Sequence, residues 1–203
     1  MQIKKYLGPL NKENPVTVQV LGVCSALAVT AQMKPAVVMG ISVALVSAFS
    51  NLILSLLRNT IPSRIRIIVQ LIVIATLVIM VDMFLQAYFY EISKLLSVFV
   101  GLIITNCIIM GRVEAFALSH KPLPSFIDGL ANGLGYGLVL VIVAFFRELL
   151  GSGTIWNHQV IPQSFYDYGY FNNGLMVLPP MALIIVGVII WIQRSRHPEL
   201  QEK

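Results

Sequence analysis

The predicted fold depends on two short apolar stretches: residues 16–30, VTVQVLGVCSALAVT, and residues 95–110, LLSVFVGLIITNCIIM. A bilayer core about 30 Å thick takes roughly 20 residues of helix. At a rise of 1.5 Å per residue, residues 16–29 reach about 21 Å and residues 95–110 about 24 Å. Each stretch holds one cysteine, Cys24 or Cys107, with Gly22 or Asn106 close by. Short spans with such interruptions are typical of broken membrane helices.

The rest of the chain indicates a membrane protein. Of its 203 residues, 57% are hydrophobic and 11% are charged, whereas soluble domains carry about 25% charged residues. Mean hydropathy is +0.83. With the two short stretches, four further segments make six predicted transmembrane helices of an all-α integral membrane protein: Ala36–Leu57, Ile67–Tyr90, Asp128–Leu149 and Met176–Gln193. The basic residues are scattered between apolar runs, which excludes a nucleic-acid-binding patch.

The positions of the two short spans predict an inverted repeat. The first short stretch, Val16–Thr30, opens one set of three spans, and the second, Leu95–Met110, opens the other. Three spans per half make the second half enter the bilayer from the opposite side. We therefore expect a single transmembrane domain over residues 1–203, with one repeat at about 16–90 and the other at about 95–193. A twofold axis in the membrane plane would bring Cys24 and Cys107 together at mid-depth.

Lysine and arginine residues predict the orientation of the chain. Eleven of the fourteen fall on one side of the six spans, and the other side holds Lys34, Lys94 and Arg147. The positive-inside rule therefore predicts that both termini are cytoplasmic.

The two cysteines allow three interpretations. Free cysteines are often inert small hydrophobes. A disulfide at mid-membrane would lack an oxidant. Thiolates also bind zinc, copper(I) and iron–sulfur clusters. A [2Fe–2S] cluster usually takes four thiolates, so two would have to come from a second chain. Gly22, Thr105 and Asn106 place a flexible backbone position and polar groups beside the cysteines, which favours ligation.

Other polar residues within the spans are candidates for function. Asp82 lies inside the third span, where a carboxylate suggests cation or proton handling, although an interfacial carboxylate is the simpler interpretation. The pairs Arg112/Glu114 and Arg147/Glu148 are interpreted as interfacial charges paired with each other or with a partner subunit. The glycines of GLANGLGYG, residues 129–137, have the small-xxx-small spacing of close helix packing.

No substrate-converting active site is recognisable in this sequence. It contains no Walker loop, no G-x-S-x-G elbow and no H-E-x-x-H motif, and its three histidines have no ligand spacing. The glycines of residues 129–137 follow no predicted strand and lack the dinucleotide-binding spacing. We expect any catalysis to belong to a complex.

Three segments resemble a known family: LGVCSALAVT around Cys24, GLIITNCIIMGRVEAFA around Cys107, and SFIDGLANGLGYG after it. They are similar to the D-subunit family of the bacterial sodium-translocating NADH:quinone oxidoreductase, and the likeness extends over nearly the whole chain. The E subunit of the related Rnf ferredoxin:NAD electron-transport complex is an alternative, but there we expect a proline where this chain has Ser25. The S/T-G-A-T motif for covalent FMN does not occur.

The resemblance implies six spans and pairing with the E subunit, a homologous partner of opposite topology. It implies that Cys24 and Cys107 supply half of an intramembrane [2Fe–2S] cluster shared with that partner, with no flavin or nucleotide on this chain. The cluster would relay electrons from a cytoplasmic NADH-oxidising subunit towards FMN on the opposite face. The six-subunit complex, in the bacterial inner membrane, would reduce ubiquinone and export sodium. A cation-path or scaffold subunit without a redox role is the remaining alternative.

Overall fold

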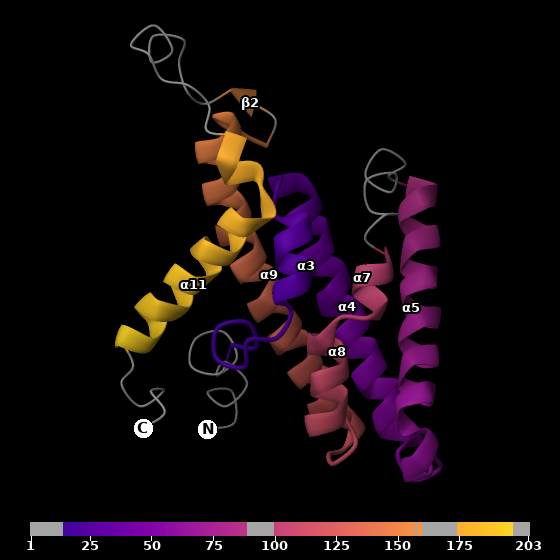
Figure 1. Ribbon diagram of the computed structural model, residues 1–203. Coiled ribbons are helices and arrows are strands. Elements are labelled where there is room, and N and C mark those ends of the chain that lie inside the picture. Colours follow the sequence, from indigo (N-terminus) through magenta and orange to yellow (C-terminus); the bar gives the residue numbers. More distant parts are fainter. Residues whose placement is uncertain (1–13, 89–99, 157, 160–173, 197–203) are drawn as a thin grey trace, which may run out of the picture.

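The computed structural model describes residues 14–88, 100–156, 158–159 and 174–196 as a bundle of helices (Figure 1). Within these residues, three helices are long and apolar enough to cross a membrane: α4 (Met33–Leu57), α5 (Arg66–Tyr88) and α9 (Pro122–Ser152). They confirm the second, third and fifth predicted spans. In a bilayer a helix satisfies its own backbone hydrogen bonds, which is why these apolar runs fold as they do.

The shorter elements join and flank these three helices. Strands β1 (Thr154–Ile155) and β2 (His158–Gln159) form an antiparallel two-stranded hairpin, a small departure from the predicted all-α fold. The remaining bounds are α3 (Val23–Val29), η1 (Ser63–Ile65), α7 (Val100–Ile104), α8 (Cys107–Arg112), the π-helical turn η2 (Val113–Ala117), η3 (Gly174–Val177) and α11 (Pro179–Arg196).

Helices α4 and α9 run antiparallel at the centre of the bundle and touch through small residues. A Cβ added to Gly133 would overlap Cα of Ala44, and one added to Gly40 would lie 2.9 Å from Cα of Gly137. Contacts this close leave no room for a larger side chain. The small-xxx-small prediction is therefore confirmed, with α4 as the packing partner.

Proline and glycine set the ends of α9. Pro122 occupies the first helical position, where a missing N–H costs nothing. At the other end Gly153 adopts a left-handed conformation (φ 66°), and its N–H donates to Leu149 O at 3.2 Å. The helix consequently extends beyond both limits of the predicted span Asp128–Leu149.

The two short spans are broken, as predicted. In the first span, the α-helix is confined to Val23–Val29, because Val20 and Gly22 have positive φ angles of 55° and 78°. In the fourth, α7 ends at Ile104 and α8 begins at Cys107. Residues 95–99 of that span lie outside the described residues.

The sixth span begins later than predicted. Residues 174–177 form the separate turn η3, and α11 starts at Pro179 rather than at Met176. The pair Pro179–Pro180 explains the difference, because proline lacks the N–H that would continue a preceding helix. The far end of α11 is Arg196 instead of Gln193.

Basic residues gather at one end of the bundle. The turns after α4 and after η2 meet there, since Arg58 Nη1 and Ser55 Oγ both donate to His120 O, at 3.0 and 2.7 Å. Helix α11 also ends towards this side (Figure 1). Among the described residues this end holds Arg58, Arg64, Arg66, Arg112, Lys121, Arg194 and Arg196, whereas Lys34 and Arg147 lie towards the other end.

Candidate functional site

The two cysteine-bearing breaks lie against each other in the bundle. The backbone N–H of Gly22, directly before α3, donates a hydrogen bond to Sγ of Cys107, with 2.9 Å between nitrogen and sulfur. Cys107 is the first residue of α8, and Cys24 follows Gly22 by two positions. The breaks thus form one junction, to which each half of the chain contributes a cysteine.

Gly22 cannot be replaced by a larger residue without strain. Its φ of 78° is left-handed, a region that disfavours side chains. An added Cβ would also lie 2.5 Å from Ile108 Cδ1 and 3.2 Å from Tyr136 Cε2. The predicted close backbone approach at Gly22 is therefore found, and the approaching residues come from α8 and α9.

The second break is held by polar groups of its own residues. Asn106 Oδ1 accepts a hydrogen bond from the N–H of Ile108 at 3.1 Å, which caps the start of α8. Thr105 Oγ1 donates to Gly101 O at 2.9 Å, one turn back. The Asn106 bond satisfies the N–H of Ile108, which the interruption would otherwise leave unpaired inside the bundle. This bond places Cys107 at the head of α8.

Tyr136 of α9 reaches the first break through Ser25. Ser25 Oγ donates to Gly22 O at 2.9 Å and lies 2.7 Å from the Tyr136 hydroxyl. Tyr136 is fully buried. The sequence analysis did not single out Tyr136, although its hydroxyl stands out within the glycine-rich run of residues 129–137. A hydroxyl inside a membrane helix needs a hydrogen-bond partner. A tyrosine at such a position therefore indicates that another polar group lies nearby.

The two cysteines suit a metal centre shared with a second chain better than a centre whose ligands all come from this chain. Both are free thiols; Cys24 is exposed and Cys107 is half-buried. In the described part of the chain, no three His, Cys, Asp or Glu side chains gather closely enough to hold a metal ion. Two thiols at a junction that is exposed on the Cys24 side fit half of a four-thiolate set, with the Gly22 N–H as an existing donor to sulfur.

Arg112 pairs with α9 rather than with its neighbour Glu114. Its guanidinium makes two hydrogen bonds to the Asp128 carboxylate, the one from Nε being 3.0 Å long. Asn132 Nδ2 donates to the same carboxylate at 3.1 Å. Both charged side chains are largely buried, so the pair links α8 to α9 in a desolvated setting. The expected pairing of Arg112 and Glu114 with each other is therefore wrong, and the alternative pairing with a partner subunit stays a prediction.

Glu114 instead contacts the start of α5. Gln70 Nε2 donates to its carboxylate at 2.9 Å, and Arg66 Nη1 does so at 3.0 Å. The Gln70 hydrogen bond, and then the Arg66 bond and charge, hold the pKa of Glu114 below its ordinary value against the opposing effect of burial. The contact lies at the end of the bundle where the basic residues gather.

Arg147 is a buried clamp at the opposite end. Arg147 is 1% exposed. It donates to two segments, bonding Leu27 O and Thr30 Oγ1 in and after α3, and Met176 O and Val177 O in η3. The neighbouring Glu148 accepts from the N–H of Met33 at 2.6 Å, at the start of α4. Arg147 and Glu148 therefore connect α9 to α3, η3 and the start of α4, and their expected pairing with each other or with a partner subunit stays a prediction.

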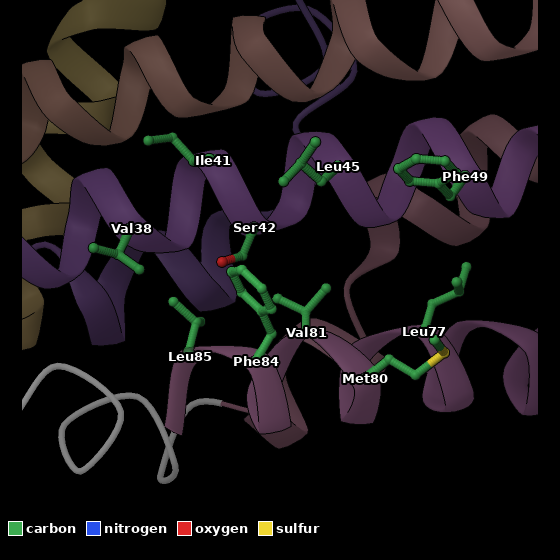
Figure 2. A pocket seen from close by; sticks show the side chains of 10 residues that line it. All are labelled: Val38, Ile41, Ser42, Leu45, Phe49, Leu77, Met80, Val81, Phe84 and Leu85. Carbon is green, nitrogen blue, oxygen red and sulfur yellow. The ribbon is translucent and has the colours of Figure 1, made fainter. Parts of the chain in front are cut away.

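Asp82 lies apart from the cysteine junction. Its Oδ2 accepts from Gln86 Nε2 of the same helix at 3.0 Å, and its Oδ1 has no hydrogen-bond partner among the described residues. A groove of about 610 Å³ lies between α4 and α5, and Figure 2 shows the side chains that line it. Its lining is apolar except for Ser42 and does not include Asp82. The groove therefore offers no carboxylate for a cation.

Comparison with known proteins gives one consistent family. The family model described as "Rnf-Nqr subunit, membrane protein" matches residues 2–190. A relative from Aeromonas salmonicida is 59% identical, covering 98% of this chain and 95% of its own, and one from Haemophilus ducreyi is 57% identical, covering 98% and 97%. A Shewanella relative is 53% identical over 99% of this chain and 96% of its own. All three are named as the D subunit of Na(+)-translocating NADH-quinone reductase.

Proposed function

Because the chain belongs to the Rnf-Nqr family of membrane subunits, we propose that it is the electron-relay D subunit of a sodium-translocating NADH:ubiquinone reductase. Cys24 and Cys107 supply two of the four thiolates of an intramembrane [2Fe–2S] cluster. The homologous E subunit supplies the other two. The observation that carries this proposal is the hydrogen bond from Gly22 N to Cys107 Sγ, which joins the two cysteine-bearing breaks.

The chemistry of the junction supports half-site ligation. Such a cluster, when bound, accepts and passes on one electron at a time. Cys24 is exposed at the junction, so a thiolate there is accessible to groups of a neighbouring chain. The Gly22 N–H stabilises negative charge on the Cys107 sulfur. This chain's part is to hold two sulfurs, donate to one of them and leave one side open to the E subunit.

The arrangement of the helices supports the inverted repeat. The proposed repeats cover about residues 16–90 and 95–193 of one transmembrane domain, residues 1–203. Each repeat opens on a broken span, and its second helix, α4 or α9, packs antiparallel against its counterpart. Gly40 meets Gly137 and Ala44 meets Gly133, as expected for two helices crossing a twofold axis.

The distribution of charge supports the orientation. The end of the bundle that carries most of the described Lys and Arg residues faces the cytoplasm under the positive-inside rule. Both termini are then cytoplasmic, in the inner membrane of a bacterium. Electrons would arrive from the NADH-oxidising side and leave towards FMN on the opposite face of the six-subunit complex. No flavin or nucleotide is assigned to this chain.

Cysteine substitution in the purified complex tests this function. Cys24→Ser and Cys107→Ser should abolish NADH-driven ubiquinone reduction, while oxidation of NADH by a soluble artificial acceptor continues. A matched control is Ser50→Ala, a buried position in α4 outside the junction. Full ubiquinone reduction in an assembled complex that lacks both cysteines would rule the proposal out.

A second candidate function is a cation path, and Asp82 favours it. One carboxylate oxygen of this membrane-helix residue has no partner among the described residues, which is costly in a bilayer unless the group has a task. Asp82→Asn should then slow sodium transport while electron transfer continues. Unchanged transport in that variant removes the reason for this alternative.

A further inference from the structure

We infer that Tyr136 is a positioning residue for the cysteine junction. Through Ser25 its hydroxyl keeps Gly22 in the conformation that directs the N–H at Cys107 Sγ, and this contact raises the reduction potential of the group that Cys107 holds. The inference rests on the proposed function, because it assigns a role to residues beside the half-site.

Gly22 is held on both sides of its Cα. On one side its N–H bonds the sulfur of Cys107 at 2.9 Å. On the other its carbonyl accepts from Ser25 Oγ at 2.9 Å and from the N–H of Ala26 at 3.1 Å. The left-handed φ of 78° is what allows both sets of bonds at once. Any force that fixes the carbonyl therefore also fixes the direction of the N–H.

Tyr136 ties this arrangement to a long helix. Its hydroxyl lies 2.7 Å from Ser25 Oγ, and both residues are buried, with exposures of 0% and 3%. Hydrogen bonds between buried groups are strengthened by the low local dielectric, and neighbouring bonds polarise one another. The short helix α3 thus takes its position at the junction from α9, which spans the bundle (Figure 1).

The sign of the effect follows from charge. Reduction adds an electron to a centre that thiolate ligands already make negative, and an N–H donor to a ligating sulfur stabilises the more negative state. A contact that is held firmly raises the reduction potential. A contact loosened by losing the Tyr136 or Ser25 hydroxyl lowers it, without removing either sulfur.

The test is an EPR-monitored redox titration of the shared cluster in the intact complex. Tyr136→Phe keeps the ring and removes the hydroxyl; Ser25→Ala removes the other member of the pair. Both variants should retain iron and show a lower midpoint potential. The double variant should fall no further than the lower of the two, because both act through Gly22. Ser50→Ala is the matched control, since Ser50 Oγ makes a similar bond to the carbonyl three residues back and is fully buried.

The outcomes separate the two proposals. An unchanged midpoint in both Tyr136→Phe and Ser25→Ala, with iron retained, overturns the positioning role and leaves the half-site intact. A midpoint that falls equally in Ser50→Ala also overturns it, because the effect would then be general. Full iron in Cys107→Ser overturns the half-site itself. Ser25→Ala keeps the inference testable if Tyr136→Phe fails to assemble.

Discussion

The Cδ1 atom of Ile108 lies 2.5 Å from the position that a Cβ at residue 22 would occupy. Gly22 and Ile108 belong to different halves of the chain, and their close approach is what allows the two cysteine-bearing breaks to meet. The hydrogen bond from Gly22 to Cys107 depends on this approach. A side chain at position 22 would therefore disturb the junction directly.

Gly22→Ala should weaken both the fold and the junction. The left-handed φ costs on the order of 1–3 kcal/mol, and the added Cβ also forces the Ile108 side chain to shift. We expect a lower thermal midpoint for the detergent-solubilised complex and a weaker or altered cluster EPR signal. Gly101→Ala is the control, because among the described residues no atom outside its own helix backbone lies within 4 Å of its added Cβ. Equal thermal midpoints for Gly22→Ala and Gly101→Ala would contradict this account of the junction.

Gly133→Ala should separate the central helices. Its Cβ would overlap the backbone of Ala44, which cannot rotate away as a side chain can. We expect a loss of about 1–3 kcal/mol, measured as a lower thermal midpoint than that of Gly187→Ala. In the part of the chain that the structure describes, the added Cβ at Gly187 meets no other element within 4 Å. A Gly133→Ala protein as stable as Gly187→Ala would show that α4 and α9 do not pack this closely.

Arg147→Met should loosen the end of the bundle where α3 and η3 meet. The substitution leaves the partly buried carbonyls of Leu27, Met176 and Val177 without this donor, and each unpaired group costs up to about 1–3 kcal/mol. Limited proteolysis and thermal unfolding should both show the change. The exposed Arg196→Met should leave them unaltered. Proteolysis at the wild-type rate in Arg147→Met would refute the clamp.

The Glu114 contact should make stability depend on pH in one direction. Its pKa is lowered by the Gln70 hydrogen bond and then by Arg66, so the folded state favours the carboxylate. That stabilisation is present above the unfolded pKa, near 4.5, and is lost as pH falls through the folded value. Wild type should therefore exceed Glu114→Gln in thermal midpoint at pH 7, and the difference should shrink in acid. A constant or widening difference would contradict the assignment.

Local patterns predict the spans and breaks well, because proline, glycine and apolar runs act over a few residues. The interruptions near Gly22 and Asn106 and the glycine face of α9 are of this kind. The partners of Arg112, Glu114 and Tyr136 are not predictable in this way, since Asp128, Gln70 and Ser25 come from other elements and depend on how the helices pack. The late start of α11 is signalled by Pro179, but the apolar residues before it mask that signal.

The central claim is that Cys24 and Cys107 hold half of a shared two-iron cluster, and its most direct test is an iron and acid-labile sulfide count with EPR. The purified complex should contain two more irons and two more sulfides than the assembled double variant Cys24→Ser/Cys107→Ser. One reduced EPR signal should be missing from that variant. Equal iron, equal sulfide and unchanged signals in both preparations would contradict the account.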